Sequence, residues 1–238
     1  MIPTGTFSSL ITLEITLSPE HVWRFDASKL FDLLCEVART LKSLRFRALA
    51  LQDYISSAPR IQLPELVNLD LRSTSGLLTF ISMPNLRTLT LGDYAGVSTS
   101  PFTSFHAPKL THLELDGIPL LDLETVSDFP WRFPELETVV LYHCQSTESF
   151  FRYASSTRDP VPGFPSLYSI VFSDPDTFPS IRSMVEGRNA PGPGYQTLKQ
   201  LRLVAWGHGL EVGDVEWLTA QGIEFFEGGP VTKGGHGI

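Results

Sequence analysis

The chain has 238 residues, of which 42% are hydrophobic and 18% charged, so it holds enough apolar side chains to bury a sizeable core. Its 18 Lys and Arg against 26 Asp and Glu give a formal net charge of −8, which disfavours binding to the phosphate backbone of nucleic acids. No apolar run approaches the roughly 20 residues that span a bilayer, and the N-terminus lacks the basic and apolar regions of a secretory signal, so we expect no membrane partner.

One apolar pattern, L-x-x-L-x-L, recurs from residue 10 to residue 203. Its copies are Leu10/Leu13/Ile15, Leu41/Leu44/Phe46, Leu66/Leu69/Leu71, Leu86/Leu89/Leu91, Leu110/Leu113/Leu115, Leu136/Val139/Leu141, Leu167/Ile170/Phe172 and Leu198/Leu201/Leu203. Independent draws from this composition would make every position of all eight copies apolar only about once in a billion, so the pattern reflects a real repeat. It is typical of leucine-rich repeats. We therefore expect an α/β leucine-rich-repeat solenoid, a right-handed horseshoe or arc, with a parallel concave sheet of about eight or nine strands.

The repeat leaves no room for a linker, which predicts a single leucine-rich-repeat domain over residues 1–227. A ninth strand is expected at residues 222–226 (GIEFF), with Ile223 and Phe225 facing the core. Residues 228–238 are rich in glycine and are expected to form a disordered tail.

The segments between strands must cross the back of the sheet, and we expect them to be partly helical. Residues 29–40 carry apolar side chains at the spacing of one helix face, and residues 149–155, 179–186 and 215–220 show the same pattern more weakly. Five copies also carry a proline two places before the first Leu, where its fixed φ and missing N–H should end the crossover and start the strand. These prolines are Pro64, Pro84, Pro108, Pro134 and Pro165.

The chain has only two cysteines, Cys35 and Cys144, and no N-x-[ST] glycosylation site. Both observations favour a reducing compartment, either the cytoplasm or the nucleus. Cys144 stands three places after the last Leu of its copy, where the leucine-rich consensus has Asn or Cys bonded to backbone groups. We expect a buried structural thiol there and not a nucleophile.

Alternation in a strand places the residues two, four and six positions after the first Leu on the concave face. Glu14, Arg45 and Asp70 alternate in charge on neighbouring strands, which predicts weak cross-strand ion pairs. His112, Glu114 and Asp116 share one strand face and could in principle bind a divalent metal. Because a strand spaces such side chains about 7 Å apart, we expect an acidic contact patch instead.

Next to these residues lies an apolar stretch, which consists of Val140, Tyr142, Val171 and Val204, with Trp206 on the following turn. Aliphatic and aromatic groups on a concave surface are the usual material of a protein-binding site. An alternative is that insertions or the tail cover this stretch. Together with His112, Glu114 and Asp116, it forms the predicted binding site for a protein partner.

Phrases such as LPELVNLDL, MPNLRTLTL, APKLTHLEL and FPELETVVL resemble the repeat regions of fungal F-box proteins, and the resemblance extends over roughly residues 7–226. It implies a substrate receptor of a cullin-type ubiquitin ligase, in which an F-box motif docks the adaptor subunit. No F-box segment precedes Phe7, so we expect any adaptor docking to use a segment absent from this chain.

The search for catalytic motifs finds no G-x-S-x-G, P-loop, G-x-G-x-x-G, H-E-x-x-H or C-x-x-C, and no metal-ligand spacing between histidines and cysteines. We therefore predict a non-enzymatic protein-interaction module with no catalytic residues, no metal and no cofactor. Two alternatives stay open: a free-standing leucine-rich-repeat scaffold unrelated to ubiquitin, and a metal-dependent enzyme that uses His112, Glu114 and Asp116.

Overall fold

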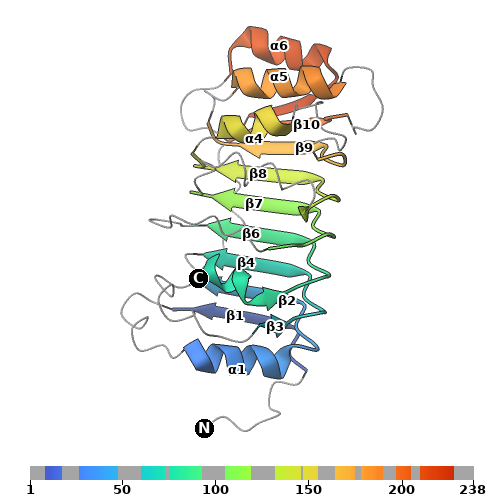
Figure 1. Cartoon of the computed structure of the whole chain (residues 1–238). Helices are drawn as coiled ribbons and strands as arrows, with labels where there is room; N and C mark the ends of the chain where they lie inside the picture. The colour runs from blue at the N-terminus through green and yellow to red at the C-terminus, as the bar shows by residue number, and fades with distance from the viewer. Residues whose placement is uncertain are drawn as a thin grey trace.

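The computed structural model shows a mixed α/β fold built on one large parallel sheet (Figure 1). It describes residues 9–17, 27–47, 60–72, 75–92, 105–118, 132–145, 147–154, 164–174, 178–189, 197–204 and 210–227. The nine strands lie side by side in chain order. They are β1 (Thr12–Thr16), β2 (Ser43–Arg47), β4 (Asn68–Arg72), β6 (Thr88–Gly92), β7 (His112–Asp116), β8 (Thr138–Tyr142), β9 (Ser169–Phe172), β10 (Gln200–Leu203) and β11 (Glu224–Glu227).

The strands coincide with the eight copies of the apolar pattern and with the ninth strand expected near the C-terminus. Their register is constant, so that Leu69 pairs with Leu44 on one side and with Leu89 on the other. From β2 to β10, the second and third apolar residues of every copy are buried in one continuous core, while those of β1 are half-buried at the edge of the sheet. Each such side chain contributes about 1.5–3 kcal/mol of burial before the cost in conformational entropy.

The five prolines stand at the second position of tight turns that lead into the strands. In each turn the first Leu of the pattern donates its N–H to the carbonyl oxygen three residues earlier, as in Leu66 to Leu63 (3.2 Å) and Leu110 to Ala107 (3.1 Å). Proline suits this position because its φ matches the turn and its missing N–H is not needed. The prediction that these prolines separate crossover from strand is confirmed.

Helices lie on the core side of the sheet, since their apolar residues belong to the same core as the strands. They are α1 (Ala27–Val37), α4 (Thr147–Ala154), α5 (Phe178–Asn189) and α6 (Val212–Ala220), in the four segments expected to be helical. Figure 1 shows α4, α5 and α6 gathered at the C-terminal end of the sheet.

Two features of the crossovers were not predicted. Strands β3 (Ile61–Gln62) and β5 (Ile81–Ser82) form a second, two-stranded parallel sheet, and a 3₁₀ helix, η3 (Ser75–Thr79), precedes β5. In addition, the buried Arg188 of α5 donates to the carbonyl oxygens of Phe164 (3.1 Å) and Leu167 (2.7 Å). Arg188 thereby satisfies backbone groups of the turn before β9 that would otherwise be costly to bury.

None of the helices in the described ranges combines the length and the apolar character needed to cross a bilayer. Residues 228–238, predicted to be a disordered tail, and Trp206 lie outside the described residues.

Candidate protein-binding face of the sheet

The face of the sheet opposite the core carries the side chains at positions two, four and six, and we call it the open face. The paired register lines these positions up in rows across the strands. The middle row reads Glu14, Arg45, Asp70, Thr90, Glu114, Val140, Val171, Arg202 and Phe226. Four of its first five residues are charged, the exception being Thr90, and three of its last four are apolar.

Ion pairs cross the first strands as the alternating charges predicted. The Arg45 guanidinium lies 3.4 Å from the Glu14 carboxylate on β1 and 3.0 Å from the Asp70 carboxylate on β4. Arg47 adds a longer contact to Asp70, at 3.7 Å. Because Arg45, Arg47 and Glu14 are about half exposed, each of these pairs contributes at most about 1 kcal/mol.

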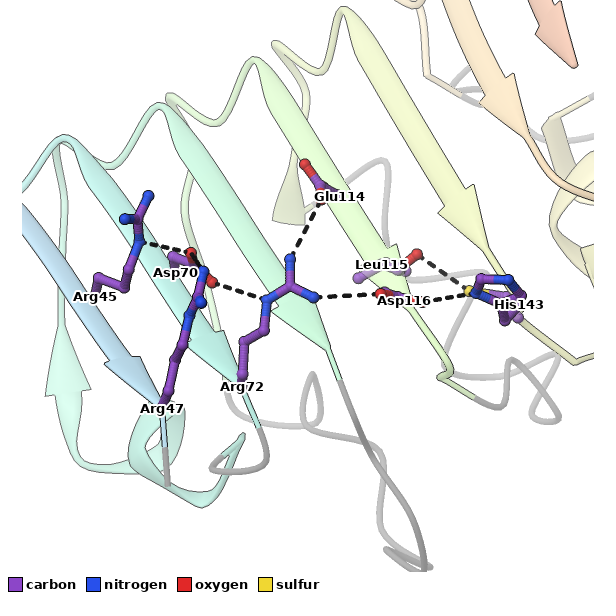
Figure 2. Close-up of polar contacts among 9 residues, drawn as sticks. Arg45, Arg47, Asp70, Arg72, Glu114, Leu115, Asp116 and His143 are labelled. Carbon is purple, nitrogen blue, oxygen red and sulfur yellow. Dashed lines mark hydrogen bonds and ion pairs between the residues drawn. The ribbon is translucent and has the colours of Figure 1, made fainter. Parts of the chain in front are cut away.

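Arg72 makes a longer connection that the sequence did not reveal. Its guanidinium lies 3.5 Å from Asp70 on its own strand, and it also reaches Glu114 (3.7 Å) and Asp116 (3.2 Å) on β7. Figure 2 shows the guanidinium between Asp70 and the two carboxylates of β7. Since β6 lies between β4 and β7, the arginine side chain must pass over an intervening strand.

The residue beneath this passage is Gly92 of β6. A Cβ atom added there would come within 3.0 Å of Arg72 Nη1 and within 3.4 Å of Asp116 Cβ. The absence of a side chain at Gly92 therefore leaves the room through which Arg72 reaches Asp116. The sequence places Gly92 in the same row as Arg72 and Asp116, but the pattern alone does not show the contact.

The predicted acidic contact patch needs correction because Arg72 pairs with two of its three members. Glu114 and Asp116 are both mostly covered, and Asp116 also lies 3.0 Å from His143 Nδ1. His112 is half-buried on the same strand face. Within the described residues, no group of three His, Cys, Asp or Glu side chains is arranged to hold a metal ion. The cation beside Glu114 and Asp116 is instead the guanidinium of Arg72.

The apolar stretch is less exposed than the alternation suggested. Val140 and Val204 are buried, with 6% and 3% of their surface accessible, so the prediction that they are exposed is wrong. Val140 lies between Glu114 and Val171 on the adjoining strands. Val204 directly follows β10 and donates its N–H to the carbonyl oxygen of Phe172 at the end of β9 (2.8 Å), which holds it against the edge of the strands.

Tyr142 and Val171 are both half-buried and remain accessible on the open face. Burial raises the pKa of the Tyr142 phenol, and the negative charges of Glu114 and Asp116 raise it further, while Arg202 acts in the opposite direction. The hydroxyl therefore stays protonated at neutral pH and can donate a hydrogen bond to a partner.

Cys144 is buried at the end of β8, as the consensus position predicted. Its Sγ lies 3.4 Å from the Leu115 carbonyl oxygen and 3.3 Å from that of Tyr142. Burial raises the pKa of the thiol to about 12, so it is not a nucleophile at neutral pH. Cys35, by contrast, is exposed on α1.

Comparisons with known proteins do not assign the chain to a family. No family model matches it, and no curated protein sequence is significantly similar to it.

The open face of this chain thus carries groups suited to recognition. Its first half holds fixed, mutually neutralised charges, and its second half offers the Tyr142 hydroxyl, the Val171 side chain, the Arg202 guanidinium and the exposed Phe226 ring. Such a mixture of aromatic, aliphatic and arginine side chains is the composition found at the centre of protein interfaces.

Proposed function

We propose that this chain is a leucine-rich-repeat solenoid that binds a protein partner on the open face of its sheet and has no enzymatic activity. The observation that carries the proposal is the constant register of nine parallel strands, which puts the second and third apolar residues of each copy on one face. Such a sheet uses one face for its core and leaves a broad, preformed surface on the other. A rigid surface of this kind loses little entropy on binding.

Tyr142 is the residue on which we base the test of this proposal. The immobilised chain is used to capture proteins from a lysate of its source cells, and the captured proteins are identified and quantified by mass spectrometry. Tyr142→Ala should reduce capture of the specific partner about tenfold or more, as loss of a central aromatic does at interfaces. Tyr168→Ala is the matched control, because Tyr168 is also half-buried but precedes β9 and lies outside the rows of the open face.

Both variants should keep the melting temperature of the parent to within a few degrees. Equal capture by the parent and both variants would remove Tyr142 from the interface and would refute binding at this part of the face.

A narrower role follows from the likeness of the repeat phrases to fungal F-box proteins. In this role the chain recognises substrates for a cullin-type ubiquitin ligase, in the cytoplasm or the nucleus, and works without a cofactor. The two free cysteines, one of them buried, agree with a reducing compartment.

The test of this role is whether the product of the whole gene co-purifies with the adaptor and cullin subunits. A product that captures its partner but never the adaptor would contradict the ubiquitin-ligase role and would support the alternative, a leucine-rich-repeat scaffold unrelated to ubiquitin.

A further inference from the structure

Arg202 differs from the other arginines of the open face. The guanidinium groups of Arg45, Arg47 and Arg72 each lie within ion-pair distance of carboxylates. None of the ion pairs or hydrogen bonds in the described ranges includes Arg202, and its Nε atom is buried without a hydrogen-bond partner. The Nε atoms of Arg72 and Arg188 are also buried without a hydrogen-bond partner, so what distinguishes Arg202 is that no carboxylate of the described residues pairs with its guanidinium. Such a guanidinium can form charge-assisted hydrogen bonds with an acceptor on a ligand.

The surroundings of Arg202 form a partly enclosed pocket of about 440 Å³, lined by Ser169, Val171, Gln200, Arg202 and Phe226. The register explains this composition. Val171 of β9 and Phe226 of β11 are the direct neighbours of Arg202, while Ser169 and Gln200 stand one row away. The pocket therefore has a cation in its middle, apolar walls on both sides and neutral polar groups at one end.

Phe226 is the second unusual feature of the pocket, since 51% of its surface is exposed. An exposed phenylalanine beside a guanidinium offers a flat apolar surface next to a charge. The nearby carboxylate of Glu224 accepts a hydrogen bond from Gln200 (3.4 Å) and does not pair with Arg202. The cation thus remains available within a chain whose net charge is −8.

We propose that this pocket receives an acidic segment of the protein partner: an Asp or Glu carboxylate pairs with Arg202, and an adjacent apolar side chain packs against Phe226 and Val171. This inference rests on the proposed protein-binding function and names the chemistry of the partner. A guanidinium matches a carboxylate because both are planar and can form two parallel hydrogen bonds.

Charge favours a carboxylate over a phosphate as the occupant. A phosphate group carries about −1.5 to −2 charges at neutral pH and is usually held by a cluster of cations. The pocket lining offers the single cation Arg202, and Glu224 stands on the adjoining strand. A carboxylate with one negative charge balances this site better.

A library of random dodecapeptides displayed on phage tests the proposal when it is selected on the immobilised full chain. Peptides enriched on the parent should carry Asp or Glu next to Leu, Phe or another large apolar residue. Peptides selected on Arg202→Gln should show no preference for acidic residues. Peptides selected on Arg202→Lys should show a weaker preference, because lysine keeps the positive charge but lacks the planar guanidinium. Phe226→Ala should keep the acidic residue but lose the preference for the apolar neighbour.

Affinities of the enriched peptides then quantify the effect. A labelled peptide from the parent selection should bind Arg202→Gln about tenfold more weakly, as expected for loss of one charged hydrogen-bonding partner. Arg182→Gln is the matched control, because Arg182 is an exposed arginine on α5 that pairs with Glu186 and lies over the Trp217 ring. It should leave binding unchanged.

Several outcomes would overturn the inference. These are enrichment of peptides without acidic residues, no enrichment at all, equal binding to the parent and Arg202→Gln, and tighter binding when the acidic residue is replaced by phosphoserine. The lysate capture with Tyr142→Ala tests the proposed function separately. If the Arg202 variants contradict this inference, the proposal that the open face binds a protein still stands or falls on the Tyr142 result.

Discussion

Replacing Arg72 by methionine tests whether the guanidinium over Gly92 stabilises the sheet. Methionine keeps most of the aliphatic stem, so packing at β4 changes little, and it removes the charged guanidinium that lies over Gly92 of β6. Three carboxylates then lose their common cation. Because Asp70, Glu114 and Asp116 are each at least three-quarters covered, water cannot replace it fully.

The expected loss of stability follows from the burial of the groups involved. Exposed ion pairs contribute about 0–1 kcal/mol, while removal of one partner from a buried pair costs about 3–5 kcal/mol. The Arg72 side chain is 25% exposed and its three acidic partners are between 15% and 25% exposed, which places this cluster between the two limits. We expect the free energy of unfolding to fall by about 2 kcal/mol.

The assay is urea unfolding followed by circular dichroism, with Arg45→Met as the matched control. Arg45 has the same chemistry on the same face, but its side chain is 45% exposed and its loss should cost less than about 1 kcal/mol. With a urea dependence of about 2–3 kcal/mol per molar, Arg72→Met should lower the midpoint by about 0.7–1 M. In 1 M salt the Debye length falls to about 3 Å, so repulsion among the carboxylates and part of the loss should disappear.

Equal midpoint shifts for Arg72→Met and Arg45→Met would refute the reasoning, because burial would then not distinguish the two arginines. A stable Arg72→Met variant with an unchanged midpoint would show that the three carboxylates do not need the guanidinium.

Three further predictions concern the space over β6, the buried thiol and the core. Gly92→Val should lower the free energy of unfolding by about 1–2 kcal/mol, because the valine displaces Arg72 from Asp116. In the Arg72→Met background the same change should lower it by less than about 0.5 kcal/mol, as urea unfolding of the parent, the two single variants and the double variant would measure. At pH 8 a thiol reagent should modify Cys35 in the native chain and leave Cys144 unreacted, because its pKa of about 12 lowers the thiolate fraction roughly a thousandfold. Leu113→Ala should cost about 3–4 kcal/mol in thermal or urea unfolding, since this side chain is fully buried in the middle of the sheet.

Each of these predictions has an outcome that contradicts it. Additive costs for Gly92→Val and Arg72→Met would mean that the two side chains do not share the same space. Modification of two thiols in the native chain would place Cys144 at the surface, whereas reaction of the second only in denaturant supports its burial. A loss below about 1 kcal/mol for Leu113→Ala would argue against a continuous core at β7.

The sheet could be predicted from the sequence because alternation in a strand has a fixed period. Once Leu69 and Leu71 are assigned to the core, Asp70 and Arg72 must face the other side, and the same rule holds for every copy. The helices followed from apolar spacing in the same way. The two-residue strands β3 and β5 were missed because a segment so short shows no period.

The candidate site could be predicted only in part, because its contacts depend on side-chain reach. The sequence placed Arg72 and Asp116 in one row, but whether an arginine passes over the intervening strand depends on the volume of the residue beneath, Gly92. Likewise, alternation put Val140 on the open face and did not show that neighbouring side chains bury it. Periodicity assigns a residue to a face, whereas exposure depends on the sizes of the residues around it.

The passage of Arg72 over Gly92 makes the arrangement of β4, β6 and β7 depend on all three strands. Adjacent strands are about 4.8 Å apart, so one more strand between β4 and β7 would move Asp116 out of the arginine's range, and one fewer would bring the two residues into direct apposition. Proteins of stacked units commonly lengthen or shorten by gaining or losing whole units. At β4, β6 and β7 such a change would separate charges that depend on one another, so variation in unit number among descendants of this chain should fall elsewhere along the stack.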